Sequence, residues 1–125
     1  MGNDCSAPVV IIDDDTAVRE SLKFLFEVAG YNVAEYASVA GFLRERILRP
    51  ACMILDHHMP EMTGLALAAQ LRGGGTHIPI LLITGSSSPA IVVRAAELGI
   101  EKVLEKPPDE HELLAFVAAY AQASG

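Results

Sequence analysis

Cysteine and basic residues are both scarce in this 125-residue chain, which has two cysteines and 9 Lys+Arg against 16 Asp+Glu. Two cysteines, Cys5 and Cys52, cannot build a disulfide framework, so a small disulfide-rich fold is excluded and a reducing compartment is indicated. The formal net charge of −7 argues against a nucleic-acid-binding surface within these residues. The same charge argues against binding to an anionic membrane.

Long apolar runs and a secretory signal are missing as well. No stretch approaches the roughly 20 apolar residues of a membrane-spanning helix, and the N-terminus has no basic region followed by a long apolar run. We therefore expect a cytoplasmic protein without membrane contact. With 51% hydrophobic residues, the chain is too apolar for disorder. Its length predicts a single domain over residues 1–125, with a flexible N-terminal segment at residues 1–7.

Short apolar runs alternate along the chain with stretches of helical periodicity. Runs typical of buried strands lie at residues 8–12, 31–36, 51–55, 78–83 and 102–105. The helical stretches that follow them begin near Thr16, Ser38, Gly64, Pro89 and Asp109. The second stretch carries Ile47 on its apolar face, and the last carries Tyr120.

Five consecutive βα units predict an α/β protein with a parallel sheet and helices on both faces. We expect a doubly wound, flavodoxin-like (βα)5 arrangement with strand order 2-1-3-4-5. In such sheets, ligands bind beyond the carboxyl ends of the strands, where the strand order reverses. The residues that directly follow the apolar runs are therefore candidate site residues: Asp13, Asp14, Asp15, Asp56, Thr84 and Lys106.

These side chains suit magnesium-assisted phosphoryl chemistry. Carboxylates gathered at one point repel each other, and oxygen ligands without thiolate or imidazole favour Mg²⁺ as the cation that relieves the repulsion. Asp56 stands alone at its strand end and is our candidate nucleophile, while Asp13 and Asp14 are candidate metal ligands. Lys106 would bind the phosphate, and Thr84 would donate a hydrogen bond to it and draw its loop inward.

In their order along the chain, these residues resemble the receiver domain of two-component response regulators, over residues 8–121. The matching features are the acidic run at residues 13–15, the stretch Asp56-His57-His58-Met59-Pro60-Glu61-Met62-Thr63-Gly64, Thr84-Gly85 and Lys106-Pro107. The helix start at residues 18–22 and the turn at residues 30–33 are most similar to regulators that pair a receiver with a helix-turn-helix DNA-binding domain.

The resemblance implies a phosphorylation switch and not a turnover enzyme. Asp56 would accept a phosphoryl group from a histidine kinase or a histidine phosphotransfer domain, and slow autodephosphorylation would follow. The implied Mg²⁺ ligands are the side chains of Asp13, Asp14 and Asp56 and the backbone carbonyl of His58. Thr84 and Lys106 would contact the phosphate, Gly85 would leave room for it, and the Lys106–Pro107 peptide bond would be cis.

The same resemblance implies the partners. The switch would regulate an output domain or partner protein in a phosphorelay that controls transcription. The fourth and fifth helices carry more apolar residues than a core needs, so their surface would form a homodimer or dock an output domain. DNA would be contacted only through an output domain outside these 125 residues.

Two positions depart from the family. Val103 stands three residues before the lysine, where the family usually has Tyr or Phe, so the aromatic part of the switch is in question while the phosphorylation chemistry is not. His57 stands after the phosphoacceptor, where an aliphatic residue is more common. We interpret His57 and His58 as solvent-facing loop residues and not as zinc ligands, because adjacent histidines diverge and no His-x3-His pair is present.

Two alternative functions are compatible with the same residues. A phosphohydrolase of the haloacid-dehalogenase kind also uses an aspartyl phosphate, Mg²⁺ and a doubly wound sheet. Its motif resembles residues 13–17, but it has Thr or Val where Ala17 stands, and this chain is too short for a cap domain. A degenerate receiver would instead act as a phosphorylation-independent interaction module, an alternative that Val103 and His57 keep open.

Overall fold

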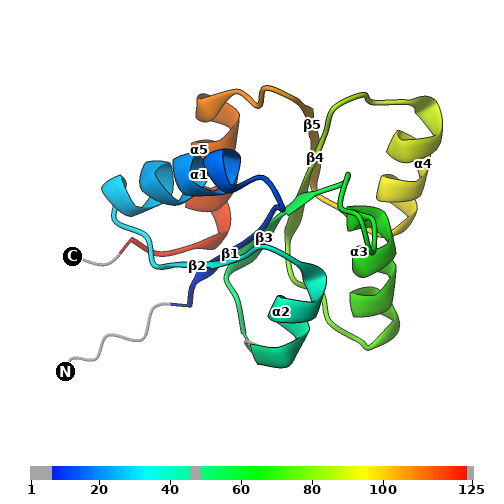
Figure 1. Ribbon diagram of the computed structural model, residues 1–125, viewed down its shortest axis with the longest axis horizontal. Helices are drawn as coiled ribbons and strands as arrows, with labels where there is room; N and C mark the ends of the chain where they lie inside the picture. Colours follow the sequence, from blue (N-terminus) through cyan, green and yellow to red (C-terminus); the bar gives the residue numbers. More distant parts are fainter. Residues whose placement is uncertain (1–6, 46–48, 124–125) are drawn as a thin grey trace.

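A five-stranded parallel sheet forms the centre of the molecule (Figure 1). The computed structural model describes residues 7–45 and 49–123, so Ile47 and all but the last residue of the segment 1–7, which we predicted to be flexible, lie outside the described residues. The strands are β1 (Val9–Ile12), β2 (Val33–Tyr36), β3 (Cys52–Asp56), β4 (Ile80–Thr84) and β5 (Lys102–Glu105). Their order, β2-β1-β3-β4-β5, confirms the prediction. β1, β3 and β4 are buried along their whole length, which explains their continuous apolar runs.

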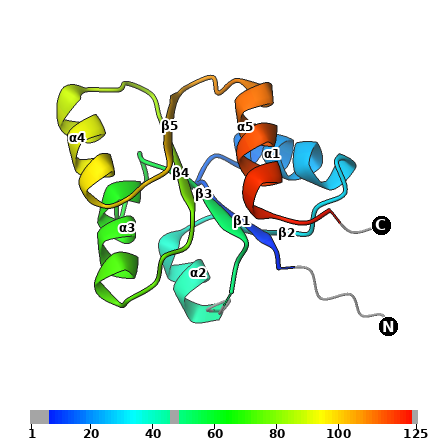
Figure 2. The same ribbon diagram turned by 180° about the vertical axis from the view of Figure 1, so that it is seen from behind.

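Helices cover both faces of the sheet. They are α1 (Thr16–Val28), α2 (Val39–Glu45), α3 (Gly64–Gly73), α4 (Pro89–Glu97) and α5 (Glu110–Tyr120). α1 and α5 lie on one face, and α2, α3 and α4 lie on the other (Figures 1 and 2). Successive strand residues point to opposite faces, so Ile54 joins the core under α1 and α5 while Leu55 joins the core under α2 to α4. None of the described helices is long and apolar enough to cross a bilayer.

Side-chain caps fix where all five of these helices begin. The capping residues are Asp15 for α1, Ser38 for α2, Thr63 for α3, Ser88 for α4 and Asp109 for α5. Each accepts a hydrogen bond from an amide in the first turn, which satisfies a donor that the helix itself leaves unpaired. Because these caps come directly after the carboxyl ends of the strands or after short loops, they hold the loops that carry the candidate site.

Three details differ from the sequence-based prediction. β2 begins at Val33 and β4 at Ile80, each two residues later than predicted, because the residues before them contribute a single carbonyl to the neighbouring strand and no continuous ladder. Tyr120 is 43% exposed and does not share the buried face of α5. Its ring instead packs against Phe116, at 5.1 Å between ring centroids.

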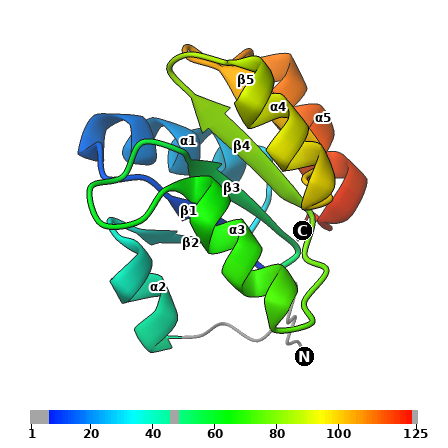
Figure 3. The ribbon, with the colours of Figure 1, turned by 90° about the vertical axis from the view of Figure 1, so that its right-hand side faces the viewer.

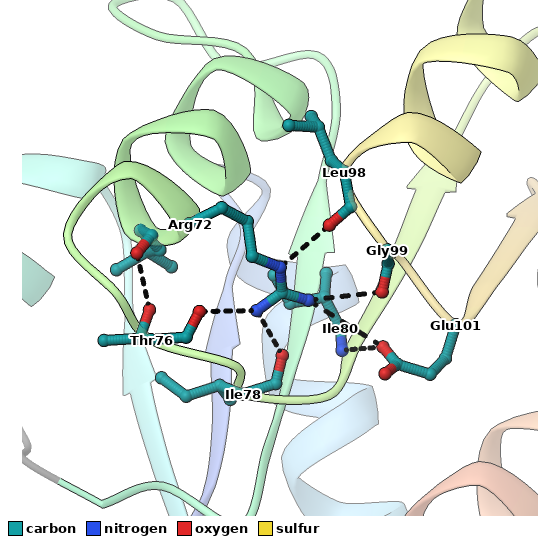
Figure 4. Close-up of polar contacts among 8 residues, drawn as sticks. Arg72, Thr76, Ile78, Ile80, Leu98, Gly99 and Glu101 are labelled. Atoms are coloured by element: carbon teal, nitrogen blue, oxygen red, sulfur yellow. Dashed lines mark hydrogen bonds and ion pairs between the residues drawn. The ribbon is translucent and has the colours of Figure 1, made fainter.

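Arg72 ties together three segments at the end of the molecule opposite the candidate site. It lies on α3, which packs beside α4 (Figure 3). Its guanidinium donates to the carbonyls of Leu98 (2.8 Å) and Gly99 (3.3 Å) after α4, and to those of Thr76 (3.3 Å) and Ile78 (2.8 Å) before β4 (Figure 4). These bonds anchor the C-terminal end of α4, whereas its N-terminal end follows the loop after Thr84.

Candidate functional site

Four strand ends place polar side chains at one edge of the sheet. Asp13 follows β1, Asp56 and Thr84 are the last residues of β3 and β4, and Lys106 follows β5. β1 and β3 are neighbours although β2 lies between them in the sequence, so the strand order reverses at this edge. Within the described ranges, Asp13, Asp56 and Thr84 are the polar residues that are buried.

A cluster of three carboxylates occupies this edge. Asp13, Asp14 and Asp56 bring carboxylate oxygens within 4.8 Å of one another, and Asp14 is the exposed member. Asp13 Oδ1 accepts a hydrogen bond from the Asp15 amide (2.9 Å), but Asp13 Oδ2 is buried without a hydrogen-bond partner. Burial raises the pKa of Asp13 to about 6, and the negative charges of Asp56 and Asp14 act in the same direction. Arg19 Nη1 donates to the Asp13 carbonyl (2.7 Å), but no ion pair to the Asp13 carboxylate is found among the described residues.

The three carboxylates fit a small, hard cation. All donors in the cluster are carboxylate oxygens, the ligands that Mg²⁺ prefers. A divalent cation would give Asp13 Oδ2 a partner and offset the repulsion among the acids. The His58 amide donates to Asp56 Oδ1 (3.3 Å), which places the main chain of His58 beside the cluster.

Lys106 supplies the positive charge on the other side of Asp56. Its Nζ lies 3.0 Å from Asp56 Oδ1, and its side chain is one-third exposed. Burial lowers the pKa of Lys106, but the hydrogen bond to Asp56 and the charges of Asp56, Asp13 and Asp14 outweigh that effect and leave the pKa raised. The Lys106–Pro107 peptide bond is cis, as expected. The ammonium group is therefore charged and adjacent to Asp56.

Thr84 is buried, and its hydroxyl is hydrogen-bonded to neighbouring groups. Thr84 Oγ1 donates to the Ser86 carbonyl (3.1 Å), accepts from the Ser86 amide (3.3 Å) and lies 3.0 Å from Nε2 of His58. His58 is exposed, as predicted, yet its ring passes over Gly85, where a Cβ would lie 3.8 Å from the ring. Sequence reasoning missed the contact between His58 and Thr84, because the two residues are 26 positions apart.

His57 corrects one prediction, because it is half-buried and not solvent-facing. Its amide donates to the Ile83 carbonyl (2.8 Å), which extends the pairing of β3 with β4 by one residue and draws the side chain toward the protein. His57 Nδ1 is buried without a hydrogen-bond partner, and the ring packs edge-on against His58. Burial and the neighbouring His58 lower the pKa of His57, while Asp56 opposes them.

Gly64 allows α3 to begin directly against the strand that carries Asp56. A Cβ at this position would lie 2.9 Å from the carbonyl oxygen of Asp56 and 2.5 Å from Leu82 Cδ1. The carbonyl belongs to a fully buried strand and has little freedom to move. The glycine that closes the 56–64 stretch is therefore required by packing at the site.

A family model described as "Response regulator receiver domain" matches residues 9–118. The chain is 41% identical over 115 residues to "Transcriptional regulatory protein FixJ" from Azorhizobium caulinodans, covering 91% of this chain and 54% of that protein. It is 38% identical over 119 residues to "Response regulator protein TodT" from Pseudomonas putida, covering 94% of this chain and 52% of that protein. The chain thus spans about half the length of the curated relatives it matches.

Solved structures agree in fold. The response regulator StyR is similar with a TM-score of 0.81 and 33% identity, over 93% of this chain and 59% of that chain. The chemotaxis protein CheY4 from Vibrio cholerae is similar with a TM-score of 0.82 and 26% identity, over 93% of this chain and 99% of that chain.

Proposed function

Because this chain belongs to the response regulator receiver domain family, we propose that Asp56 is the residue on which it accepts a phosphoryl group in two-component signalling. The observation that carries the assignment is the position of Asp56, which lies between a carboxylate cluster suited to a cation and the ammonium group of Lys106. Asp13 and Asp14 cannot replace it, because neither contacts a lysine in the way that Asp56 does.

The proposed step is an in-line phosphoryl transfer. A carboxylate oxygen of Asp56 forms a bond to phosphorus while the bond between phosphorus and the imidazole nitrogen of a phosphohistidine breaks. The electron pair stays on the imidazole, which takes up a proton when the product requires one, and Asp56 becomes an acyl phosphate. Lys106 Nζ, already 3.0 Å from Asp56, contacts the transferred group, and Thr84 donates a hydrogen bond to one of its oxygens.

Receiver domains bind Mg²⁺ in general, and the carboxylate cluster has the composition for it. Asp13, Asp14 and Asp56 would hold the ion, with the backbone carbonyl of His58 as a further ligand. When bound, Mg²⁺ neutralises phosphoryl oxygens and permits two anions to approach each other. The protein contributes the fixed positions of the acids, which β1 and β3 set, and the burial of Asp13 and Asp56, which would strengthen their electrostatic attraction to a cation.

Receiver domains are signalling domains that interact with histidine kinases, and typically they are not enzymes. We propose that this chain is cytoplasmic and that its phosphoryl donor is a histidine kinase or a histidine phosphotransfer domain, with slow autodephosphorylation of Asp56. We propose that residues 1–125 form one receiver domain and that an output domain outside these residues contacts DNA. We also propose that phosphorylation promotes a homodimer through α4 and α5. Val92 and Val93 support the dimer, because they leave an apolar surface on α4 with 48% and 57% exposure.

Intact-mass spectrometry tests the phosphoacceptor. Incubation of the whole chain with acetyl phosphate and Mg²⁺ should add one phosphoryl group, and EDTA or the Asp56→Asn substitution should abolish the adduct. Asp15→Asn is the matched control, because asparagine caps α1 as aspartate does and residue 15 belongs to the same acidic run. An unmodified wild-type chain would support the interaction module, and sustained hydrolysis of phosphomonoesters would support the phosphohydrolase.

A further inference from the structure

The proton of the Thr84 hydroxyl is already engaged in this structure. The Ser86 amide donates to the hydroxyl oxygen, and two possible acceptors of its proton, the Ser86 carbonyl and Nε2 of His58, both lie within hydrogen-bond distance. A phosphoryl oxygen on Asp56 only accepts hydrogen bonds, so it needs the single Thr84 proton. That proton is already donated, either to the Ser86 carbonyl or to Nε2 of His58. Thr84 therefore has to leave a present partner before it can contact a phosphoryl group.

His58 is held in place by its own contacts. Its amide donates to Asp56 Oδ1 (3.3 Å), and its ring stands edge-on to the His57 ring at 5.1 Å between centroids. The ring lies over Gly85, where a Cβ would be in ordinary van der Waals contact at 3.8 Å. The His58 side chain thus spans from the loop after β3 to the end of β4.

The side chain of Val103 on β5 does not compete with His58 for the Thr84 hydroxyl. The valine side chain is half-buried and packs into the core under α2 to α4. It carries no polar group for Thr84, and its short side chain cannot reach outward as a ring would. Among the side chains that the structure describes, His58 is the one that hydrogen-bonds the Thr84 hydroxyl.

We propose that the side chain of His58 is a positioning residue that holds Thr84 in the unphosphorylated arrangement and so sets how readily the domain switches. The proposal rests on Asp56 being the phosphoacceptor. The side chain of His58 has a role separate from that of its backbone carbonyl, which we proposed as a ligand of the metal. A phosphoryl group shifts Thr84 to the phosphorylated arrangement only as far as its contacts favour that arrangement over the unphosphorylated one. The hydrogen bond between His58 and Thr84 exists only in the unphosphorylated arrangement. Its loss therefore shifts the equilibrium toward the phosphorylated arrangement.

Binding of a phosphoryl mimic measures this effect. The mimic is beryllium fluoride, titrated with Mg²⁺ into the whole chain and followed by the backbone amide NMR signals of the residues around Asp56, which every variant retains. His58→Ala should bind it roughly two- to tenfold more tightly than wild type, the range expected for one hydrogen bond. His58→Gln should bind the mimic like wild type, because the side-chain amide nitrogen of glutamine would lie near the position of Nε2. His77→Ala, an exposed histidine near the amino end of β4, is the control for loss of an imidazole and should have no effect.

A double-mutant cycle separates positioning from a general effect of His58. In a Thr84→Val background, which has no hydroxyl, His58→Ala should leave the affinity for beryllium fluoride unchanged. Equal affinities of wild type and His58→Ala, or a gain that persists in the Thr84→Val background, would overturn the proposal. Failure of the wild-type chain to bind the mimic at all would instead overturn the assignment of Asp56.

Discussion

Asp13 combines burial, a carboxylate charge and an oxygen atom without a hydrogen-bond partner. A group of this kind lowers stability unless a ligand completes it, because a buried charge has lost its hydration. The folded-state pKa of about 6 lies above the ordinary value of 3.8, so the folded chain binds more protons than the unfolded chain at pH values between them. The contribution of Asp13 to stability is therefore greatest at low pH and falls as the pH rises through about 6.

Asp13→Asn should stabilise the metal-free protein at neutral and alkaline pH. Asparagine keeps an oxygen for the Asp15 amide and places a donor beside Asp56 and Asp14. The gain over wild type should grow by about 1–2 kcal/mol between pH 5 and pH 8, as the wild-type carboxyl loses its proton. Urea unfolding in EDTA at pH 5 and pH 8 measures this difference in the free energy of unfolding between Asp13→Asn and wild type.

Added Mg²⁺ should reverse the order of stability between these two proteins. The wild type gains stability by mass action when its site binds the cation, whereas Asp13→Asn has lost a ligand. A variant that is less stable than wild type at pH 8 in EDTA would contradict the destabilising role of the Asp13 charge.

At the scale of elements, Arg72 holds α4 to the rest of the fold at one end only. Its side chain is 15% exposed and donates to carbonyls on both sides, after α4 and before β4. Glu101 strengthens this junction, because its carboxylate accepts from the Ile80 amide (2.8 Å) (Figure 4). The N-terminal end of α4 is attached to Thr84 through the loop at residues 85–88, in which the Ser87 amide donates to the Glu105 carboxylate (2.8 Å).

Arg72→Ala should lower the free energy of unfolding by about 2–4 kcal/mol, because it leaves several partly buried carbonyls without their charged donor. Arg94→Ala is the matched control. Arg94 is exposed and pairs with Glu97 on the same helix, so its loss should change stability by less than about 0.5 kcal/mol. Urea denaturation compares the two, and equal effects would show that the Arg72 bonds contribute little.

The order and type of the elements could be predicted from the sequence, because burial on both faces makes β1, β3 and β4 continuous apolar runs. The caps Ser38 and Asp109 were recognisable because they precede helical periodicity. The residues of the candidate site were recognisable by position, since parallel strands end at one edge. The side chains of His57, His58 and Arg72 were not, because their partners are set by loop backbones and by segments distant in sequence.

On the scale of the whole molecule, two pairs of large apolar side chains are exposed on different helices. Val92 and Val93 lie on α4, and Phe24 and Val28 lie on α1, on the opposite face of the sheet. The α4 pair adjoins residues of both charge signs, with Arg94 and Glu97 on the same helix. A two-fold dimer needs such a self-complementary surface, because each patch meets its own copy. The α4 pair also belongs to the helix that follows Thr84 and its loop.

Phosphorylation should therefore strengthen a homodimer through α4 and not through α1. Val93→Glu places a negative charge within an apolar contact and opposite its own copy, so the beryllium fluoride-treated protein should stay monomeric. Val28→Glu makes the same change on a side chain that is 70% exposed on α1, and it should leave the dimer intact. Sedimentation velocity with and without beryllium fluoride and Mg²⁺ measures the change in mass. A dimer that persists in Val93→Glu but dissociates in Val28→Glu would show that the interface lies on α1. A wild-type chain that stays monomeric with and without beryllium fluoride would contradict dimerisation altogether.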